Sequence, residues 1–204
     1  MKRMVFADIM NAEFRWPTAG DQAFVAAADP LENANIADDG FTRLVLMMEG
    51  YKKAGDLMVD RSIDDPSDRD FLVCPIIFNY RQFIELSLKY IIATYGPTVG
   101  VAANWSTHDL ETLWAAFTDV LAAYGTSDPD DADPVVARVA AEFAKIDPGS
   151  YSHRYPVDRK GKPVPLAIAD LHLPTLADVM EGVAGYFTGC DGYLSDVKGA
   201  PPTA

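Results

Sequence analysis

The sequence predicts an all-α protein, an up-and-down bundle of about five helices, and three observations carry this prediction. Apolar residues recur at helical spacing through most of the chain after residue 40. No segment alternates apolar and polar residues long enough to form a strand hairpin, and at most 164–168 is expected to be extended. No internal repeat or heptad run is present. A chain of 204 residues is long enough to bury one core, so we expect one compact domain.

The chain divides into three parts by its apolar pattern. Residues 1–40 show no sustained period, which predicts an irregular N-terminal arm whose aromatic side chains pack on the core. Residues 41–196 are expected to form the helical bundle domain. Residues 197–204 are rich in Pro and Ala and are predicted to be a disordered tail.

The first two helices are expected at about 41–59 and 71–95. Asp38 or Asp39 is available as the N-cap of the first helix. The second helix is apolar on nearly every face, so it should occupy the middle of the bundle. Pro75 is near its start: a missing N–H is tolerated in a first turn, and a kink is expected otherwise.

Three further helices are expected after these. The third begins at an N-cap, Ser106 or Thr107, and the fourth covers about 135–146. Pro174 is placed for the first turn of the last helix. One long loop, predicted to be ordered, connects the last two helices.

The net charge limits the kinds of binding partner that we expect. The chain has 30 acidic and 17 basic residues and a net charge of -13, which disfavours a broad nucleic-acid groove but not a local basic patch. No apolar run approaches the ~20 residues of a membrane span. The first residues are too polar for a signal peptide, so a cytoplasmic location is expected. Two cysteines are too few for a disulfide framework.

Three charged residues stack on one face of the second helix. Arg81, Glu85 and Lys89 are spaced by four residues. One interpretation is a surface ladder of ion pairs. The other is that a central helix exposes little surface, so these charges line a groove or meet polar partners from another element, because a buried unpaired charge is costly.

The loop from residue 150 to 165 holds a dense basic cluster in an acidic protein. Its basic side chains are His153, Arg154, Arg159, Lys160 and Lys162. Tyr151 and Tyr155 are interleaved with them, and arginine, imidazole and aromatic rings together favour holding a phosphate and stacking a base. In the alternative interpretation Arg154 ties the loop to helix carboxylates and the lysines form a solvated turn.

The three histidines indicate no metal site. His108, His153 and His172 are too scattered for a metal-binding pattern, and neither a metal nor a cofactor is predicted. His153 is the better candidate for acid–base chemistry because groups that can orient it and bind phosphate flank it. His108, at the start of the third helix, is a second candidate. No P-loop, Rossmann glycine pattern or GxSxG elbow is present.

Three motifs together resemble the HEPN superfamily of helical bundles. They are YRQFIELSLK at 80–89, THDLETLW at 107–114 and SHRYPVD at 152–158, and the resemblance covers about 71–194. The resemblance implies an α-helical bundle, often dimeric, from bacterial defence or toxin–antitoxin systems. Active members of the superfamily cut RNA without a metal, and others only bind RNA or nucleotides. The Arg and His of the ribonuclease members, four to six residues apart, have no counterpart in this sequence.

The resulting hypothesis is a HEPN-like bacterial protein that recognises RNA or a nucleotide through the basic loop. The candidate ligand-binding residues are Arg81, Glu85, Lys89, Tyr151, Tyr155 and Asp158, and the candidate catalytic residues are His153, Arg154 and His108. Two alternatives stay open: a metal-independent endoribonuclease, and a non-catalytic helical dimerisation or interaction protein. A homodimer is expected, and a cognate protein partner is possible.

Overall fold

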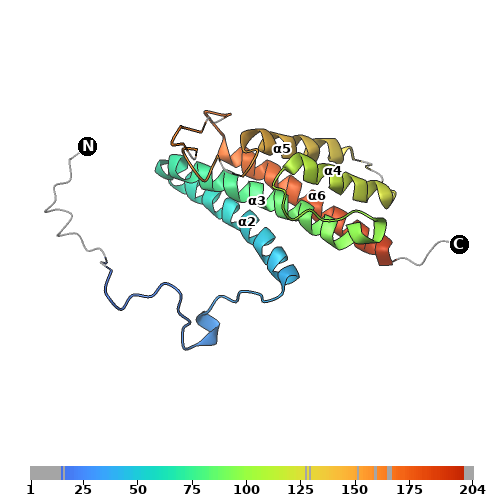
Figure 1. Cartoon of the computed structure of the whole chain (residues 1–204). Coiled ribbons are helices and arrows are strands. Elements are labelled where there is room, and N and C mark those ends of the chain that lie inside the picture. Colours follow the sequence, from blue (N-terminus) through green and yellow to red (C-terminus); the bar gives the residue numbers. More distant parts are fainter. Residues whose placement is uncertain are drawn as a thin grey trace. The chain divides into compact units, whose positions relative to one another are not determined.

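A computed structural model describes the chain at residues 15, 17–126, 128, 130–150, 152–158, 160–164 and 167–199. Five α-helices, α2 to α6, make up most of these residues (Figure 1). The β pairing found in the described residues is one isolated bridge between Val157 and Pro163. The prediction of an all-α helical bundle is therefore confirmed. The bridge lies before the expected extended piece at 164–168, which includes residues outside the described ones.

The N-terminal segment has little regular structure in its described part. Residues 17–36 contain one short 3-10 helix, η1 (Pro30–Glu32). Asp29 caps it, because its carboxylate accepts from the Leu31 N–H at 2.9 Å. The packing of this arm on the core stays a prediction.

The first two helices of the bundle are longer than the sequence pattern indicated. The α2 helix (Gly40–Asp64) begins after Asp39, whose carboxylate accepts from the Thr42 N–H at 2.7 Å, so one of the two expected N-caps is confirmed. The short η2 (Pro66–Asp68) leads directly into α3 (Arg69–Tyr95). Pro75 lies inside α3, past its first turn, which is the position for which a kink is expected.

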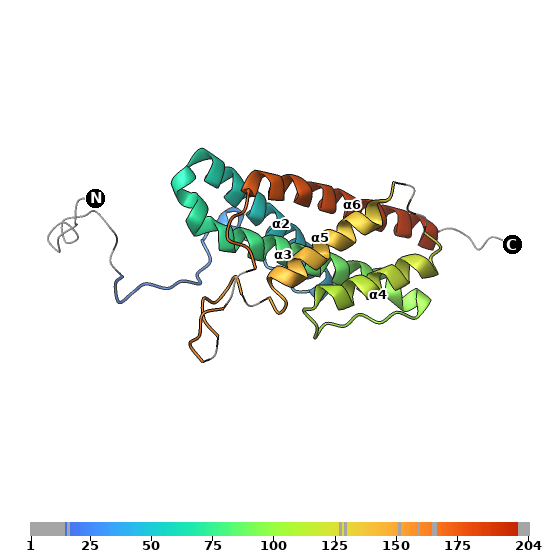
Figure 2. The ribbon, with the colours of Figure 1, turned by 90° about the horizontal axis from the view of Figure 1, so that it is seen from above.

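The remaining helices complete the bundle. They are η3 (Gly96–Val99), α4 (Leu110–Ala123), α5 (Ala132–Ile146) and α6 (Leu173–Gly199). Residues 197–199 thus belong to a helix, while 200–204 of the expected tail lie outside the described residues. In Figure 2 the loop that follows α5 stands out from the bundle at the end of that helix. Among the described helices, none combines the length and apolar character needed to cross a membrane.

The N-cap of α4 differs from the expected one. Asp109 caps the helix, and its two carboxylate oxygens accept from the Glu111 and Thr112 N–H groups at 3.2 and 3.3 Å. Thr107 instead accepts the Asp109 N–H at 3.1 Å, one turn before the helix. The expectation of Ser106 or Thr107 as the cap was wrong because a carboxylate satisfies two orphan N–H groups at once.

The α3 helix is central, as its apolar pattern predicts. It contacts α2, α4 and α6, and it is buried on most of its faces. Phe83 of α3 packs edge to face on Phe187 of α6, with ring centroids 6.2 Å apart, and Phe187 packs likewise on Phe117 of α4 at 5.9 Å. Packing against three other helices therefore fixes the position of α3 and of the side chains that it contributes to the site.

Candidate functional site

An ionic network lies inside the bundle on α3. Arg81, Glu85 and Lys89 are 0%, 2% and 4% exposed. Glu85 Oε2 accepts from Arg81 Nη1 at 3.0 Å, and Oε1 accepts from Lys89 Nζ at 2.8 Å. The interpretation as a surface ladder was wrong. These charges meet polar partners from other elements, as the alternative interpretation predicted.

Arg81 joins three elements through one guanidinium group. Its Nε donates to the Asp147 carbonyl after α5 at 2.9 Å, and its Nη2 donates to the His108 carbonyl before α4 at 2.7 Å. Since Nη1 bonds to Glu85, each of its three nitrogens already donates within the protein. Arg81 therefore holds the fold, and its ligand-binding role stays a prediction that needs these bonds to open.

His108 is the exposed member of the network. Its Nδ1 lies 2.8 Å from Glu85 Oε1, while its side chain is 59% exposed. Burial raises the pKa of Glu85, but the hydrogen bonds and charges of Lys89 and His108 outweigh it and hold that pKa below its usual value. An ionised carboxylate only accepts, so Nδ1–H donates to it. Nε2 is then left without a protein partner in the described part of the chain.

His153 has the opposite environment. It is 8% exposed, and neither ring nitrogen has a hydrogen-bond partner among the described residues. Burial lowers its pKa, the Asp147 charge opposes this change and the Arg81 charge adds to it. A buried neutral imidazole does not reach a bound ligand in this conformation, and the catalytic role expected for His153 stays a prediction.

The described part of the basic loop, residues 152–158 and 160–164, forms a short hairpin that Asp158 holds together. The Asp158 N–H donates to the Lys162 carbonyl at 2.8 Å. Its carboxylate accepts from the backbone N–H groups of Lys160 and Lys162 at 2.7 and 3.0 Å. Gly161 has a φ of +76°, which favours glycine. Asp158 thus builds the turn that exposes both lysine side chains, and its expected contact with a ligand stays a prediction.

The base of the hairpin is fixed to α3 and α5. Asp147 Oδ1 accepts from the Ser152 N–H at 2.8 Å, and Gln82 Nε2 of α3 donates to Ser150 Oγ at 2.7 Å. Ser150 is buried with a φ of +55°, a strained conformation for a residue with a side chain. These contacts fix the direction in which the hairpin leaves the bundle.

Among the described cations of the hairpin, Arg154 is the best placed to bind a ligand. Its Nε donates to the Ser150 carbonyl, and its guanidinium carbon lies 5.7 Å from the ring centroid of Phe78 and 5.8 Å from that of Tyr155. The residue is exposed, and Nη1 and Nη2 have no partner in the described ranges. No carboxylate there pairs with it, so the interpretation in which Arg154 ties the loop to helix carboxylates was wrong.

The structure brings some of the expected site residues together and not others. His108, Glu85, Lys89 and Arg81 form one network, and Arg154 and Tyr155 form a second group on the hairpin. Tyr151 and Arg159 lie outside the described residues. Sequence reasoning missed Phe78 and Ser150, because an apolar helix residue and a serine carry no signal of their neighbours.

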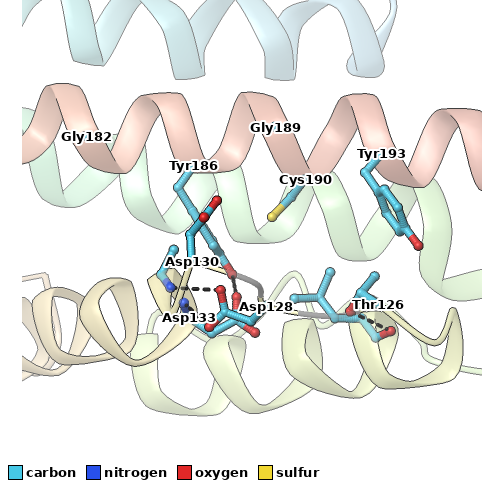
Figure 3. Close-up of a pocket in the computed structure, with 11 residues that line it drawn as sticks. Thr126, Asp128, Asp130, Asp133, Gly182, Tyr186, Gly189, Cys190 and Tyr193 are labelled. Carbon is cyan, nitrogen blue, oxygen red and sulfur yellow. Dashed lines mark hydrogen bonds between the residues drawn. The ribbon is translucent and has the colours of Figure 1, made fainter.

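A separate hollow of about 520 Å³ lies between α6 and the loop that leads into α5 (Figure 3). Tyr186, Cys190 and Tyr193 project from α6 toward this loop. Tyr186 donates to Asp133 Oδ1 at 2.6 Å, and Asp128 accepts from the first N–H groups of α5. Its charged lining residues in the described chain are all aspartates, which is unsuitable for a phosphate. The basic hairpin is therefore the better candidate.

Comparisons with known proteins add no family to these observations. No family model matches the chain, and no curated protein or solved structure matches it at a significant level. The HEPN resemblance stays a prediction. Within the described ranges, no group of three or more His, Cys, Asp and Glu side chains is placed to hold a metal ion.

Proposed function

We propose that this protein binds RNA or a nucleotide through its basic hairpin, with Arg154 holding a phosphate group. The supporting observation is that Arg154 is fixed at Nε and against two rings, while both terminal nitrogens lack a protein partner among the described residues. A guanidinium fork matches two phosphate oxygens. Because the side chain is already held, binding costs little conformational entropy.

The two lysines of the hairpin add to the local positive field. Lys160 and Lys162 are exposed on a turn whose one described acid, Asp158, is engaged with backbone N–H groups. The rest of the protein is strongly acidic, with a net charge of -13. Phosphate is therefore attracted to the hairpin and repelled elsewhere, which favours a localised ligand over bulk nucleic acid.

Tyr155 supplies the other half of nucleotide recognition. Its ring is 49% exposed and lies against the Arg154 guanidinium. An exposed ring next to a phosphate-binding group favours stacking on a base. Adjacent residues of one loop thus supply the phosphate contact and the stacking ring.

The test is binding of a labelled oligoribonucleotide and of AMP, measured by fluorescence anisotropy and calorimetry. Arg154→Ala is expected to weaken both about tenfold to a hundredfold, since hydrogen bonds to charged groups are worth about 1.5–3 kcal/mol. Arg138→Ala is the matched control, because Arg138 is exposed on α5. Equal affinities for wild type and Arg154→Ala, or no binding by wild type, would refute the proposal and favour an interaction protein.

A second function, cleavage of RNA without a metal, is supported by the Glu85–His108 pair. A carboxylate that fixes Nδ1 leaves Nε2 as a base for a ribose 2′-OH. O2′ then bonds to phosphorus, the P–O5′ bond breaks, and the leaving oxygen takes a proton from water, which gives a 2′,3′-cyclic phosphate. Cleavage in EDTA that His108→Gln abolishes would support this function, and intact RNA with wild-type protein would rule it out.

A further inference from the structure

One stripe of side chains on α3 contacts two loops at the candidate site: the hairpin and the loop between α3 and α4. Its members, spaced by three or four residues and so on one face of the helix, are Phe78, Gln82, Glu85, Lys89 and Ala93. The first two contact the hairpin and its base. The next two contact the loop between α3 and α4, and the last lines a hollow beside that loop.

The stripe fixes the order of the exposed groups. Arg154 lies over Phe78, His108 bonds to Glu85 and the Trp105 carbonyl accepts from the next residue of the stripe at 3.5 Å. Eleven residues of helix separate the first and last of these anchors, which is about 17 Å at 1.5 Å per residue. The exposed residues Arg154, His108 and Trp105 thus follow one another over the buried stripe, and together they form a track that ends at Arg154 and at Trp105.

The hollow beside Trp105 is suited to an aromatic ring. It measures about 510 Å³ and lies on the surface. Its lining residues are Ala93, Pro97, Gly100, Val101, Ala102, Ala103 and Trp105, and no charged side chain is among them. The Trp105 side chain is 55% exposed. Across the described residues, the backbone N–H groups of Ala102 and Ala103 donate to no protein group, so they are available to the edge of a base.

We infer that the ligand is a single strand of RNA that runs along this track, with a phosphate on Arg154 and a base stacked on Trp105. This inference rests on the proposed function and names its substrate class. Only an unpaired base has a face free for an exposed ring, so a duplex does not fit. A track of about 17 Å holds about five stacked nucleotides at a 3.4 Å rise, and fewer when the strand is extended.

The test is the affinity of the full chain for oligoriboadenylates of one to eight nucleotides. Wild type is expected to bind more tightly with each added nucleotide up to about five and to gain little beyond that length. Trp105→Ala should weaken binding of the pentamer by about tenfold to a hundredfold and leave the affinity for AMP unchanged. Trp105→Phe should retain most of it. Phe71→Ala, at an exposed aromatic residue of α3 outside the track, is the control.

The outcomes separate this inference from the proposed function. If AMP and the pentamer bind equally well and both depend on Arg154, the track is refuted while the phosphate site stands. Equal binding of the pentamer and of an RNA duplex of the same length would also refute the track. If neither AMP nor the pentamer binds, the proposed function fails, and the inference fails with it.

Discussion

Arg81 and Arg154 both donate to the turn that joins α5 to the hairpin, yet Arg81 stabilises the fold and Arg154 is placed to bind a ligand. Arg81 is completely buried, and its nitrogens donate to Glu85 and to two backbone carbonyls. Arg154 is exposed, donates once to the turn and has two nitrogens that lack a partner among the described residues. Burial decides the role: a buried guanidinium must satisfy every donor inside the protein, whereas a fixed and exposed one is prepared for a ligand.

The two histidines of the region repeat this contrast. His108 is exposed and oriented by a buried carboxylate, and His153 is buried without a hydrogen-bond partner in the described residues. The sequence favoured His153 as the acid–base group, because basic residues flank it. The geometry favours His108, because only its ring is accessible to a ligand. Neighbours in sequence are thus a poor guide to the environment of an imidazole.

The largest effect is expected from Arg81→Met. Removing one partner of a buried ion pair costs about 3–5 kcal/mol, because Glu85 then stays buried with one fewer donor. For a chain of this size, the loss corresponds to a fall in Tm of about 6–20 °C. Urea unfolding followed by circular dichroism measures it.

Arg154→Ala is the control for that experiment. Its side chain is exposed and makes one hydrogen bond and two ring contacts, so its free energy of unfolding should fall by only about 1 kcal/mol, well below the loss in Arg81→Met. Equal losses of stability in the two variants would contradict the claim that Arg81 stabilises the fold far more than Arg154 does.

Protonation of His153 is expected to have a smaller effect, on how the free energy of unfolding changes with pH. The pKa of His153 is lowered from 6.5 in the folded protein. Below pH 6.5 the unfolded chain therefore binds a proton at this residue more readily than the folded protein does. The stability that neutral His153 contributes is present above pH 6.5 and is lost on acidification, with a slope of at most about 1.4 kcal/mol per pH unit.

The measurement is the free energy of unfolding at pH 7.5 and pH 5.5 for wild type and His153→Gln. The variant should lose less stability than wild type between these two pH values. An identical loss in both proteins would show that His153 titrates as a solvated group.

The smallest effect is expected from Lys160→Gln. Lys160 is exposed on the turn, and its contribution to phosphate binding is purely electrostatic. The slope of log K against log salt should fall by about 0.7 for single-stranded RNA. Lys145→Gln, at an exposed lysine of α5, should leave the slope unchanged. A change of slope in the control alone would place the RNA on another surface.

Helix periodicity and caps predict most of this fold. Asp39 was one of two expected caps at the start of α2, and the apolar character of α3 correctly predicted its central place. The burial of Arg81 was one of two interpretations that the sequence left open. The start of α4 was missed because Thr107 and Asp109 both have capping side chains, and only the geometry of the first turn decides between them.

The candidate site was less predictable, for a physical reason. The partners of Arg81 include backbone carbonyls of Asp147 and His108, and every residue type has such a carbonyl. The contact of Arg154 with Phe78 joins residues far apart in sequence. Side-chain type predicts which chemistry a region can supply, and tertiary packing decides which groups remain free to supply it.

The most direct test of this account follows the Nε–H signals of both arginines in one NMR spectrum during titration with the riboadenylate pentamer. Assignment comes from Arg81→Lys and Arg154→Lys. The account predicts that the Arg154 signal shifts progressively and saturates, while the Arg81 signal stays in place because its guanidinium remains bonded inside the protein. A shift of the Arg81 signal with an unchanged Arg154 signal would contradict it.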